Sequence, residues 1–235
     1  MTYNLLRAFA AAAIVVACAP SSAASRTKDS TTSAAATASK AAAAPAARDS
    51  VSDRADRGRI LGDSTASLWV IMASDFQCPF CKQWHDADFK RIVDGYVKTG
   101  RVRLAFLNMP LSMHQFAVPA AEAAMCASVQ NKFWPMHEAL FSTQQRWESV
   151  ADPAPIFDSL ATSAGVNIAS WRTCVKDHLT LPLIQADHDR VAAAHVNSTP
   201  TFFVGDDILA GADKNVAKAI DAALAKAPSG KKPAS

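Results

Sequence analysis

The pattern of apolar residues changes abruptly near residue 68. Residues 68–73 form a continuous apolar run, which is typical of a strand buried on both faces. Apolar residues then recur at helical spacing from Phe89 to Val97, and Gly100 fits a helix end. Residues 102–107 resemble a second strand. A strand, a helix and a strand in this order predict a βαβ unit with parallel strands and a right-handed crossover.

Residues 114 to about 196 contain no convincing strand and instead predict an inserted helical block. The candidate helices are 117–130, 133–145, 156–164, 168–177 and 183–196. Two short apolar runs, 201–204 and 208–211, flank a Gly-Asp turn and predict a β-hairpin. A last helix would place Val216 and Ile220 on one face. The expected fold is therefore of the α/β class, in the order β-α-β, helical block, β-β-α.

The first 18 residues have the pattern of an export signal. Arg7 precedes an apolar run over residues 8–17, which is too short to span a bilayer core of about 30 Å. Residues 15–18 resemble a bacterial lipobox, in which Cys18 would be diacylated and become the new N-terminus. The alternative is a simple cleaved signal with a small-residue cleavage site at 22–24.

Residues 19–57 are rich in Ala, Ser, Thr and Lys and contain no aromatic residue. This composition cannot bury enough apolar area to offset the entropy of ordering, so it predicts a disordered tether. The folded domain is expected over residues 58–228, followed by a polar tail at 229–235. The net charge is +3 and the basic residues are scattered, which argues against a nucleic-acid partner. Membrane contact is expected through a lipid anchor at most.

Cys78 and Cys81 form a Cys-X-X-Cys pair between the predicted strand and helix. Haem attachment needs His directly after the second cysteine, where this chain has Lys82. A zinc site needs a second ligand pair, and neither Cys126 nor Cys174 has a close companion of ligand type. A redox pair explains the position, because free N–H groups at a helix N-terminus favour thiolate. Such a pair exchanges disulfides without a cofactor or metal.

The order of the two cysteines assigns them different roles. Cys78 would be the exposed nucleophile with a lowered pKa, and Cys81, one turn later, would resolve its mixed disulfides. Pro79 is tolerated in the first turn, where its missing N–H would be unpaired anyway. Phe80, together with Phe76, is a candidate for an apolar surface that contacts substrate.

Three segments carry a family resemblance. Residues 75–81, DFQCPFC, resemble the active-site stretch of the DsbA-like thioredoxin-fold oxidoreductases. Residues 132–137 resemble the helical insert of that family, and residues 198–204 resemble its cis-proline strand. The resemblance implies a thioredoxin fold and a thiol–disulfide oxidoreductase that acts on cysteines of exported proteins or peptides. It further implies a monomer, periplasmic or membrane-tethered, that a separate redox partner resets.

The resemblance also assigns roles far from the cysteine pair. Pro200 should be cis, with its loop against Cys78, and the backbone of Thr199 should dock an extended substrate. The alternative is an ordinary trans turn. Cys126 and Cys174 are expected to form a structural disulfide, since the domain is exported and the family often has a second pair in this region. The alternative is two buried free thiols.

One position departs from the family pattern. Related proteins usually carry a buried acid six residues before the first active-site cysteine, where this chain has Met72. Its loss should slow proton transfer at Cys81 unless water or Lys82 substitutes. Thiol oxidation is the favoured direction. The alternatives are a reductase or isomerase of the same fold, or a non-catalytic tethered binding or chaperone module.

The remaining polar side chains are not expected to carry chemistry. His85 is placed on a solvated face of the active-site helix, and Asp187 in a solvated cluster with His188 and Asp189. The other histidines lack metal-like spacing and are assigned to satisfied helix positions: His114, His137, His178, His188 and His195.

Overall fold

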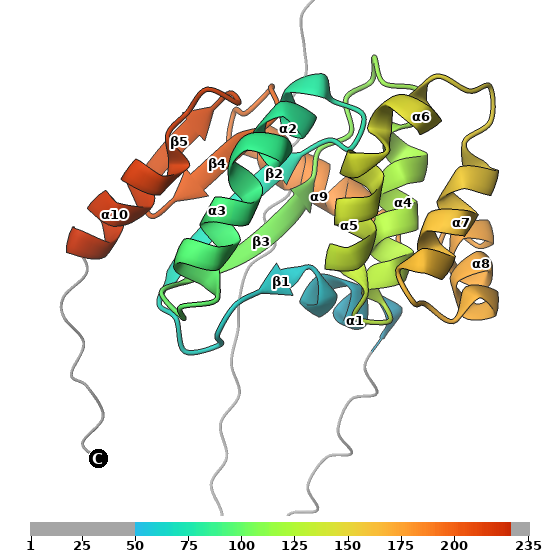
Figure 1. Ribbon diagram of the computed structural model, residues 1–235, viewed down its shortest axis with the longest axis horizontal. Helices are drawn as coiled ribbons and strands as arrows, with labels where there is room; N and C mark the ends of the chain where they lie inside the picture. Colours follow the sequence, from blue (N-terminus) through green and yellow to red (C-terminus); the bar gives the residue numbers. More distant parts are fainter. Residues whose placement is uncertain (1–49, 227–235) are drawn as a thin grey trace, which may run out of the picture. The chain divides into compact units, whose positions relative to one another are not determined.

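The computed structural model describes residues 50–226 (Figure 1). The expected export signal with Cys18, most of the expected tether and the polar tail lie outside these residues. Across residues 50–226, no helix combines the length and apolarity that crossing a membrane requires.

A five-stranded mixed sheet organises the domain, in the order β1-β3-β2-β4-β5. The strands are β1 (Ile60–Leu61), β2 (Leu68–Ser74), β3 (Val102–Asn108), β4 (Thr201–Val204) and β5 (Asp207–Ala210). β2 and β3 run parallel with Leu68 opposite Val102, as the βαβ pattern predicts. β4 pairs antiparallel with β2, and the β4–β5 hairpin is the one expected from the sequence.

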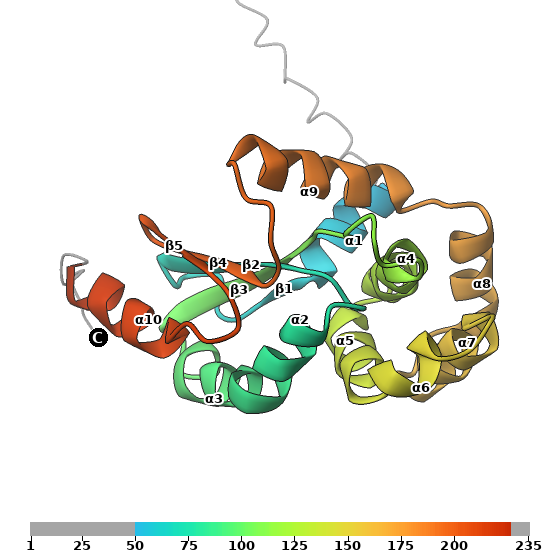
Figure 2. The ribbon, with the colours of Figure 1, turned by 90° about the horizontal axis from the view of Figure 1, so that it is seen from above.

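The segment between β2 and β3 is helical from Pro79 to Val97. It comprises α2 (Pro79–Trp84), the π-helical η1 (His85–Phe89), α3 (Lys90–Ile92) and the π-helical η2 (Val93–Val97). Ile92 and Val97 are buried from this segment, as the apolar spacing predicts. Figure 2 shows α2, α3 and α10 (Val216–Lys226) on one face of the sheet, and α1 (Val51–Gly58) and α9 (Leu181–Ala193) on the other.

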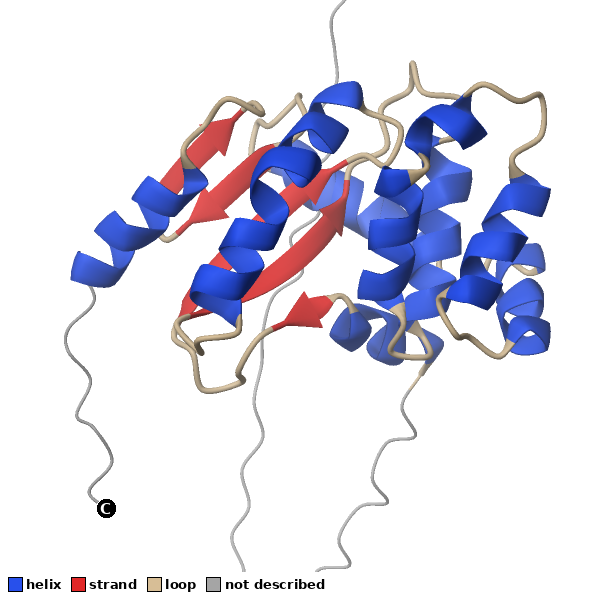
Figure 3. Cartoon of the chain, in the orientation of Figure 1, coloured by secondary structure: helices blue, strands red, loops and turns tan. Residues whose placement is uncertain are grey.

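In the chain, the helical block follows β3 and precedes β4. In space, it lies beside the sheet (Figure 3). Before α9 it contains α4 (Ala117–Ser128), α5 (Phe133–Ser142), α6 (Gln144–Glu148), α7 (Ala154–Ser163) and α8 (Ile168–Lys176). α4 is its central helix, and its small side chains allow α1, α5, α7, α8 and α9 to pack around it. Cys126 of α4 and Cys174 of α8 are joined by a disulfide.

The expected tether ended at residue 57, but the folded domain begins earlier, with α1. Ser50 caps this helix in a capping box with Asp53. Ala55 is fully buried against α4, and its carbonyl accepts a hydrogen bond from Ser128 Oγ at 2.6 Å. A Cβ at Gly58 would lie 2.3 Å from Ser128 O, so glycine permits this close contact. The composition of residues 19–57, taken as a whole, gave no sign of α1, because the contact of this helix with α4 is made by small residues.

Asp187 was expected in a solvated cluster, and this prediction is wrong. Its side chain is fully buried and pairs with Arg59, which is itself buried. It also accepts the Asn108 backbone N–H at 3.1 Å and the Asn108 side-chain amide at 2.9 Å. A buried carboxylate needs such compensation. Asp187 therefore fastens α9 to the end of β3, whereas His188 and Asp189 are exposed.

Candidate active site

The loop after β2 places the two cysteines at the start of α2. Cys78 is the N-cap residue, with extended backbone angles, and Pro79 opens the helix. Cys78 was expected to be exposed, but only 3% of its surface is accessible, and Cys81 is 2% exposed. Cys78 is covered because the loop before β4 lies against it: its Sγ is 3.6 Å from the Thr199 carbonyl oxygen.

The loop that covers Cys78 is held by the sheet. The Thr199–Pro200 peptide bond is cis. Thr201 follows directly as the first residue of β4 and pairs with Ala73 of β2, so the loop and the cysteine pair emerge at the same end of neighbouring strands. The Thr199 hydroxyl is buried and has no hydrogen-bond partner within residues 50–226, which leaves it available to a thiolate at Cys78.

The two sulfurs differ strongly in acidity. Hydrogen bonding from the Cys81 thiol, aided by the Thr199 hydroxyl and the backbone N–H groups of Cys81 and Phe80, lowers the pKa of Cys78 to about 6, against the effect of burial. Burial raises the pKa of Cys81 well above its usual value, and a thiolate on Cys78 raises it further. Near neutral pH, Cys78 is therefore the thiolate and Cys81 the thiol.

This difference predicts the pH dependence of alkylation. The iodoacetamide reaction at Cys78 of the reduced protein should accelerate as pH rises through about 6 and then level off, because thiolate is the reactive form. Mass spectrometry of the modified Cys78 peptide measures the rate at each pH. An ordinary thiol would give a midpoint at a pH of about 8.5, and that result would contradict the assignment.

Gln144 of α6 holds the active-site loop from the helical block. Its side-chain amide donates hydrogen bonds to the Phe76 carbonyl at 2.7 Å and to the Cys78 carbonyl at 3.1 Å. The residue is 1% exposed, so both bonds are shielded from water. Sequence reasoning missed it because a single glutamine in a helical segment carries no recognisable signal.

Two further residues fasten the same loop to residues 109–116. The buried Asp75 carboxylate accepts the Leu111 N–H at 2.9 Å and lies 2.7 Å from His114 Nδ1. Gln77 Oε1 accepts the Phe116 N–H at 2.7 Å. Asp75 and Gln77 belong to the stretch that carried the family resemblance, but the sequence assigned them no role. His114 lies in this loop rather than at the helix position expected for it.

Met72 lies in the core, 1% exposed, where its strand partners are Phe106 and Phe202. It offers no group that could transfer a proton to Cys81. Besides the Cys78 sulfur, the Ser74 hydroxyl and the Asp75 backbone N–H interact with Cys81. Residue 72, where related proteins usually carry a buried acid, therefore supplies no carboxylate for proton exchange at Cys81.

The predictions for His85 and His137 also fail, whereas His178 and His195 lie in the turns after α8 and α9 rather than within helices. His85 is buried, with its ring stacked between Phe89 and Phe141 and its Nε2 2.9 Å from Glu138. His137 is fully buried beside it, and neither ring nitrogen has a hydrogen-bond partner among the described residues. Burial lowers the pKa of His137 well below its usual range, so the ring is neutral. His85 was misplaced because α5 packs over the active-site helix, whereas His137 lies on a helix as expected but its ring nitrogens are unpaired within residues 50–226.

Of the two phenylalanines expected in a substrate-contact surface, Phe80 is exposed and Phe76 is buried. Phe80 is 60% exposed and lines a cavity of about 490 Å³ together with Gln83, Thr199 and Gly211. Phe76 is 1% exposed and stacks on Phe106, so its expected part in that surface is wrong. Within the described part of the chain, no cluster of His, Cys, Asp or Glu side chains could hold a metal ion.

The fold agrees with the comparison to known families. A family model described as thioredoxin matches residues 54–222, and the chain belongs to that family. The match begins within α1, which supports placing this helix in the folded domain.

The individual relatives are named either as Na(+)/H(+) antiporters or as disulfide bond formation proteins. The Na(+)/H(+) antiporter NhaA 3 of Salinispora tropica is 33% identical over 150 residues, 63% of this chain and 22% of the antiporter. The chain thus spans only 22% of the antiporter's length. Disulfide bond formation protein D of Bacillus subtilis is 23% identical over 160 residues, 64% of this chain and 68% of that protein. The crystal structure of oxidised BdbD from Bacillus subtilis, 23% identical, has a TM-score of 0.64 and matches 72% of this chain and 94% of its own.

Proposed function

We propose that the protein is a DsbA-like thiol–disulfide oxidoreductase that oxidises cysteines of exported proteins. The observation that carries this proposal is the division of acidity between Cys78 and Cys81 at the start of α2. A lowered pKa makes Cys78 both a good nucleophile and a good leaving group. The raised pKa of Cys81 keeps this resolving thiol protonated until it attacks a mixed disulfide on Cys78. A purely structural disulfide would need neither property.

The reaction begins with the pair oxidised. A substrate thiolate attacks Cys78 Sγ, which forms a mixed disulfide and releases Cys81 as a thiolate that takes up a proton. A second substrate thiolate then attacks the substrate sulfur of the mixed disulfide, and Cys78 leaves as a thiolate. The substrate loses two electrons to form its disulfide, and the pair gains them. A separate redox partner then reoxidises Cys78 and Cys81.

The acidity of Cys78 also favours this direction. A thiolate stabilised in the folded protein stabilises the reduced pair relative to the disulfide, which makes the disulfide more oxidising. The raised pKa of Cys81 has little opposing effect at neutral pH, because an unperturbed thiol is also protonated there. The value for Cys78 remains above the roughly 3.5 of the strongest oxidants, so a milder oxidant is expected.

The substrate would dock beside the loop before β4. The cavity lined by Phe80 and Thr199 lies next to Cys78 and offers apolar contact. Backbone pairing at Thr199 would hold an extended chain in register. The protein would act as a monomer facing the periplasm, exported through its first 18 residues and tethered through a lipid at Cys18. The disulfide between Cys126 and Cys174 suits such an oxidising compartment.

The deciding experiment is the redox potential of the Cys78–Cys81 pair, measured by equilibration with glutathione. It is combined with a rate assay on a reduced, unfolded protein that contains a native disulfide. A potential well above about −200 mV with rapid substrate oxidation is expected. A value near or below about −270 mV would instead indicate a reductase. A pair that does not exchange with glutathione at all would leave only a non-catalytic binding module.

A further inference from the structure

Asp75 connects the two active-site cysteines to the loop over residues 109–116. Its backbone N–H contacts the Cys81 sulfur, and its carbonyl accepts the Cys78 N–H at 3.1 Å. Its carboxylate is fully buried and lies 2.7 Å from His114 Nδ1. One residue therefore contacts both cysteines with its backbone and a histidine with its side chain.

Cys81 must gain and lose a proton in each reaction cycle. It takes up a proton when a substrate opens the disulfide, and it must release one before the disulfide closes again. The residue is 2% exposed, so bulk water has little access to its sulfur. Met72 carries no acid, and the Ser74 hydroxyl that interacts with Cys81 is itself buried. The proton therefore needs another ionisable group between Cys81 and solvent.

The pair formed by Asp75 and His114 has the properties of such a group. The His114 side chain is 16% exposed, whereas the Asp75 side chain is fully buried, so the pair extends from the active site toward the surface. A carboxylate bonded to one ring nitrogen fixes the tautomer of a histidine and stabilises the imidazolium that forms when the other nitrogen takes a proton. Imidazole gains and loses protons near neutral pH, which suits a proton carrier.

The charges around this pair couple it to the cysteines. The titratable groups on the side of α2 are Cys81, at the Asp75 N–H, and Cys78, which faces Cys81. The other bonds of the carboxylate come from uncharged groups, the Gln77 N–H at 2.7 Å and the Leu111 N–H at 2.9 Å. A thiolate at either cysteine places a second negative charge near the carboxylate. A proton on the histidine offsets that charge, so proton loss at the sulfur favours proton uptake by the pair.

We propose that His114, acting through Asp75, takes up the proton that Cys81 releases when the active-site disulfide closes, and returns a proton when it opens. This inference rests on the proposed function and adds a proton relay, His114 with Asp75, to the same site. On closing, the Cys81 thiol gives its proton to the relay, and its sulfur attacks Cys78 Sγ of a mixed disulfide. The new S–S bond replaces the old one, so the Cys81 sulfur is oxidised and the leaving sulfur is reduced to a thiolate. His114 then passes the proton to solvent.

The test measures the closing step by itself. Reduced full-length protein is mixed with excess oxidised glutathione and quenched with acid, and mass spectrometry separates the mixed disulfide at Cys78 from the closed disulfide. The variant is His114→Asn, because asparagine places an N–H where histidine has Nδ1 but carries no exchangeable charge. Near neutral pH, the mixed disulfide should close at least about tenfold more slowly in this variant than in wild type. Equal closing rates would overturn the inference.

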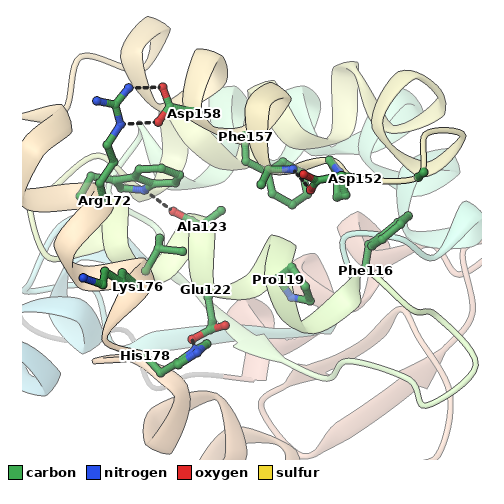
Figure 4. Close-up of a pocket in the computed structure, with 15 residues that line it drawn as sticks. Phe116, Pro119, Glu122, Ala123, Asp152, Phe157, Asp158, Arg172, Lys176 and His178 are labelled. Carbon is green, nitrogen blue, oxygen red and sulfur yellow. Dashed lines mark hydrogen bonds and ion pairs between the residues drawn. The ribbon is translucent and has the colours of Figure 1, made fainter.

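His178 provides the matched control, because it forms a pair of the same kind in the helical block. Its Nδ1 lies 2.8 Å from the buried Glu122 (Figure 4). This pair borders a cavity of about 530 Å³ between α4, α7 and α8, and the cavity lining includes neither active-site cysteine. His178→Asn therefore makes the same change at a carboxylate–histidine pair outside the active site. It should keep the wild-type closing rate at every pH.

The pH profile separates a proton relay from a purely structural role of His114. Without the relay, hydroxide must take the proton, so the closing rate of His114→Asn should rise about tenfold per pH unit, more steeply than that of wild type. The alkylation midpoint of Cys78 should stay unchanged, because other groups lower the Cys78 pKa. A loss by the same factor at every pH would show that His114 only holds the loop, and would overturn the inference. His114→Gln, which also lacks an ionisable group, serves if His114→Asn does not fold.

Failure of the relay and failure of the proposed function give different results. If the closing rate depends on His114 but the wild type does not oxidise a reduced, unfolded protein, the proposed function fails and the relay stands. If wild type oxidises that substrate rapidly and His114→Asn closes its disulfide at the wild-type rate, only the relay fails.

Discussion

Replacing Cys78 by serine should abolish thiol–disulfide exchange, with a loss of at least about a thousandfold in rate. The reason is that Cys78 supplies the only sulfur with a lowered pKa within residues 50–226, whereas Cys81 is 2% exposed and its pKa is raised well above the usual value. A substrate therefore cannot use Cys81 in its place. Oxidation of a dithiol peptide by the purified full-length protein measures the effect. Residual activity within tenfold of wild type would contradict this assignment of roles.

Replacing Cys81 provides the matched control, because it should change the outcome rather than stop the first step. Cys81→Ser can still attack a disulfide through Cys78 but cannot resolve the product, so mixed disulfides should accumulate on Cys78. Non-reducing mass spectrometry detects them. The hydrogen bond from Cys81 is also the largest cause of the lowered Cys78 pKa. Cys81→Ala should therefore shift the midpoint of Cys78 alkylation to higher pH, and Cys81→Ser should shift it less.

Removal of the disulfide between Cys126 and Cys174 should have the largest effect on stability. The two residues are separated by 48 positions, and the chain-entropy relation gives about 4 kcal/mol for a closed loop of that length. The double variant Cys126→Ala/Cys174→Ala should lose stability of this order, because its unfolded chain regains that freedom. Urea unfolding followed by circular dichroism measures the difference.

Two comparisons identify the source of that loss. Both cysteines are buried, so the alanines also remove packing contacts. Reduction of the wild-type protein breaks the bond while it keeps the side chains, and it should reproduce most of the loss. Cys78→Ser unfolded under oxidising conditions shows whether the active-site pair contributes. Equal unfolding free energies for oxidised wild type and the double variant would show that the disulfide does not stabilise the domain.

The central part of the fold was predictable because local patterns there agree with the tertiary structure. β2 is buried over most of its length and therefore reads as a continuous apolar run. The helical segment before β3 shows its buried face through the spacing of Ile92, Tyr96 and Val97. β1 was not predicted, since a strand of two residues at the edge of the sheet has no pattern to detect. α1 escaped detection because its burial rests on an alanine and a glycine.

The site was predictable only in part. The cysteine pair and the Thr199–Pro200 loop carry motifs, so the sequence pointed to both, although 121 positions separate Cys78 from Thr199. The accessibility of Cys78 was misjudged, because a helix N-terminus is open until another segment lies across it. Gln144 escaped notice for a related reason. Its role exists only where α6 lies against the Phe76 and Cys78 carbonyls.

The sequence by itself determined the order of β2 to β5 and of most helices between and after them, the position of the reactive pair at a helix start, and the family. These properties depend on residues close together along the chain, where side-chain period and backbone chemistry act directly. The tertiary structure alone decided the burial of Cys78, His137 and Asp187, the fastening of the active-site loop by Gln144 and Asp75, and the cavity between α4, α7 and α8. Burial and hydrogen bonding at these places depend on segments distant in sequence, whose arrangement is set by packing of the whole domain.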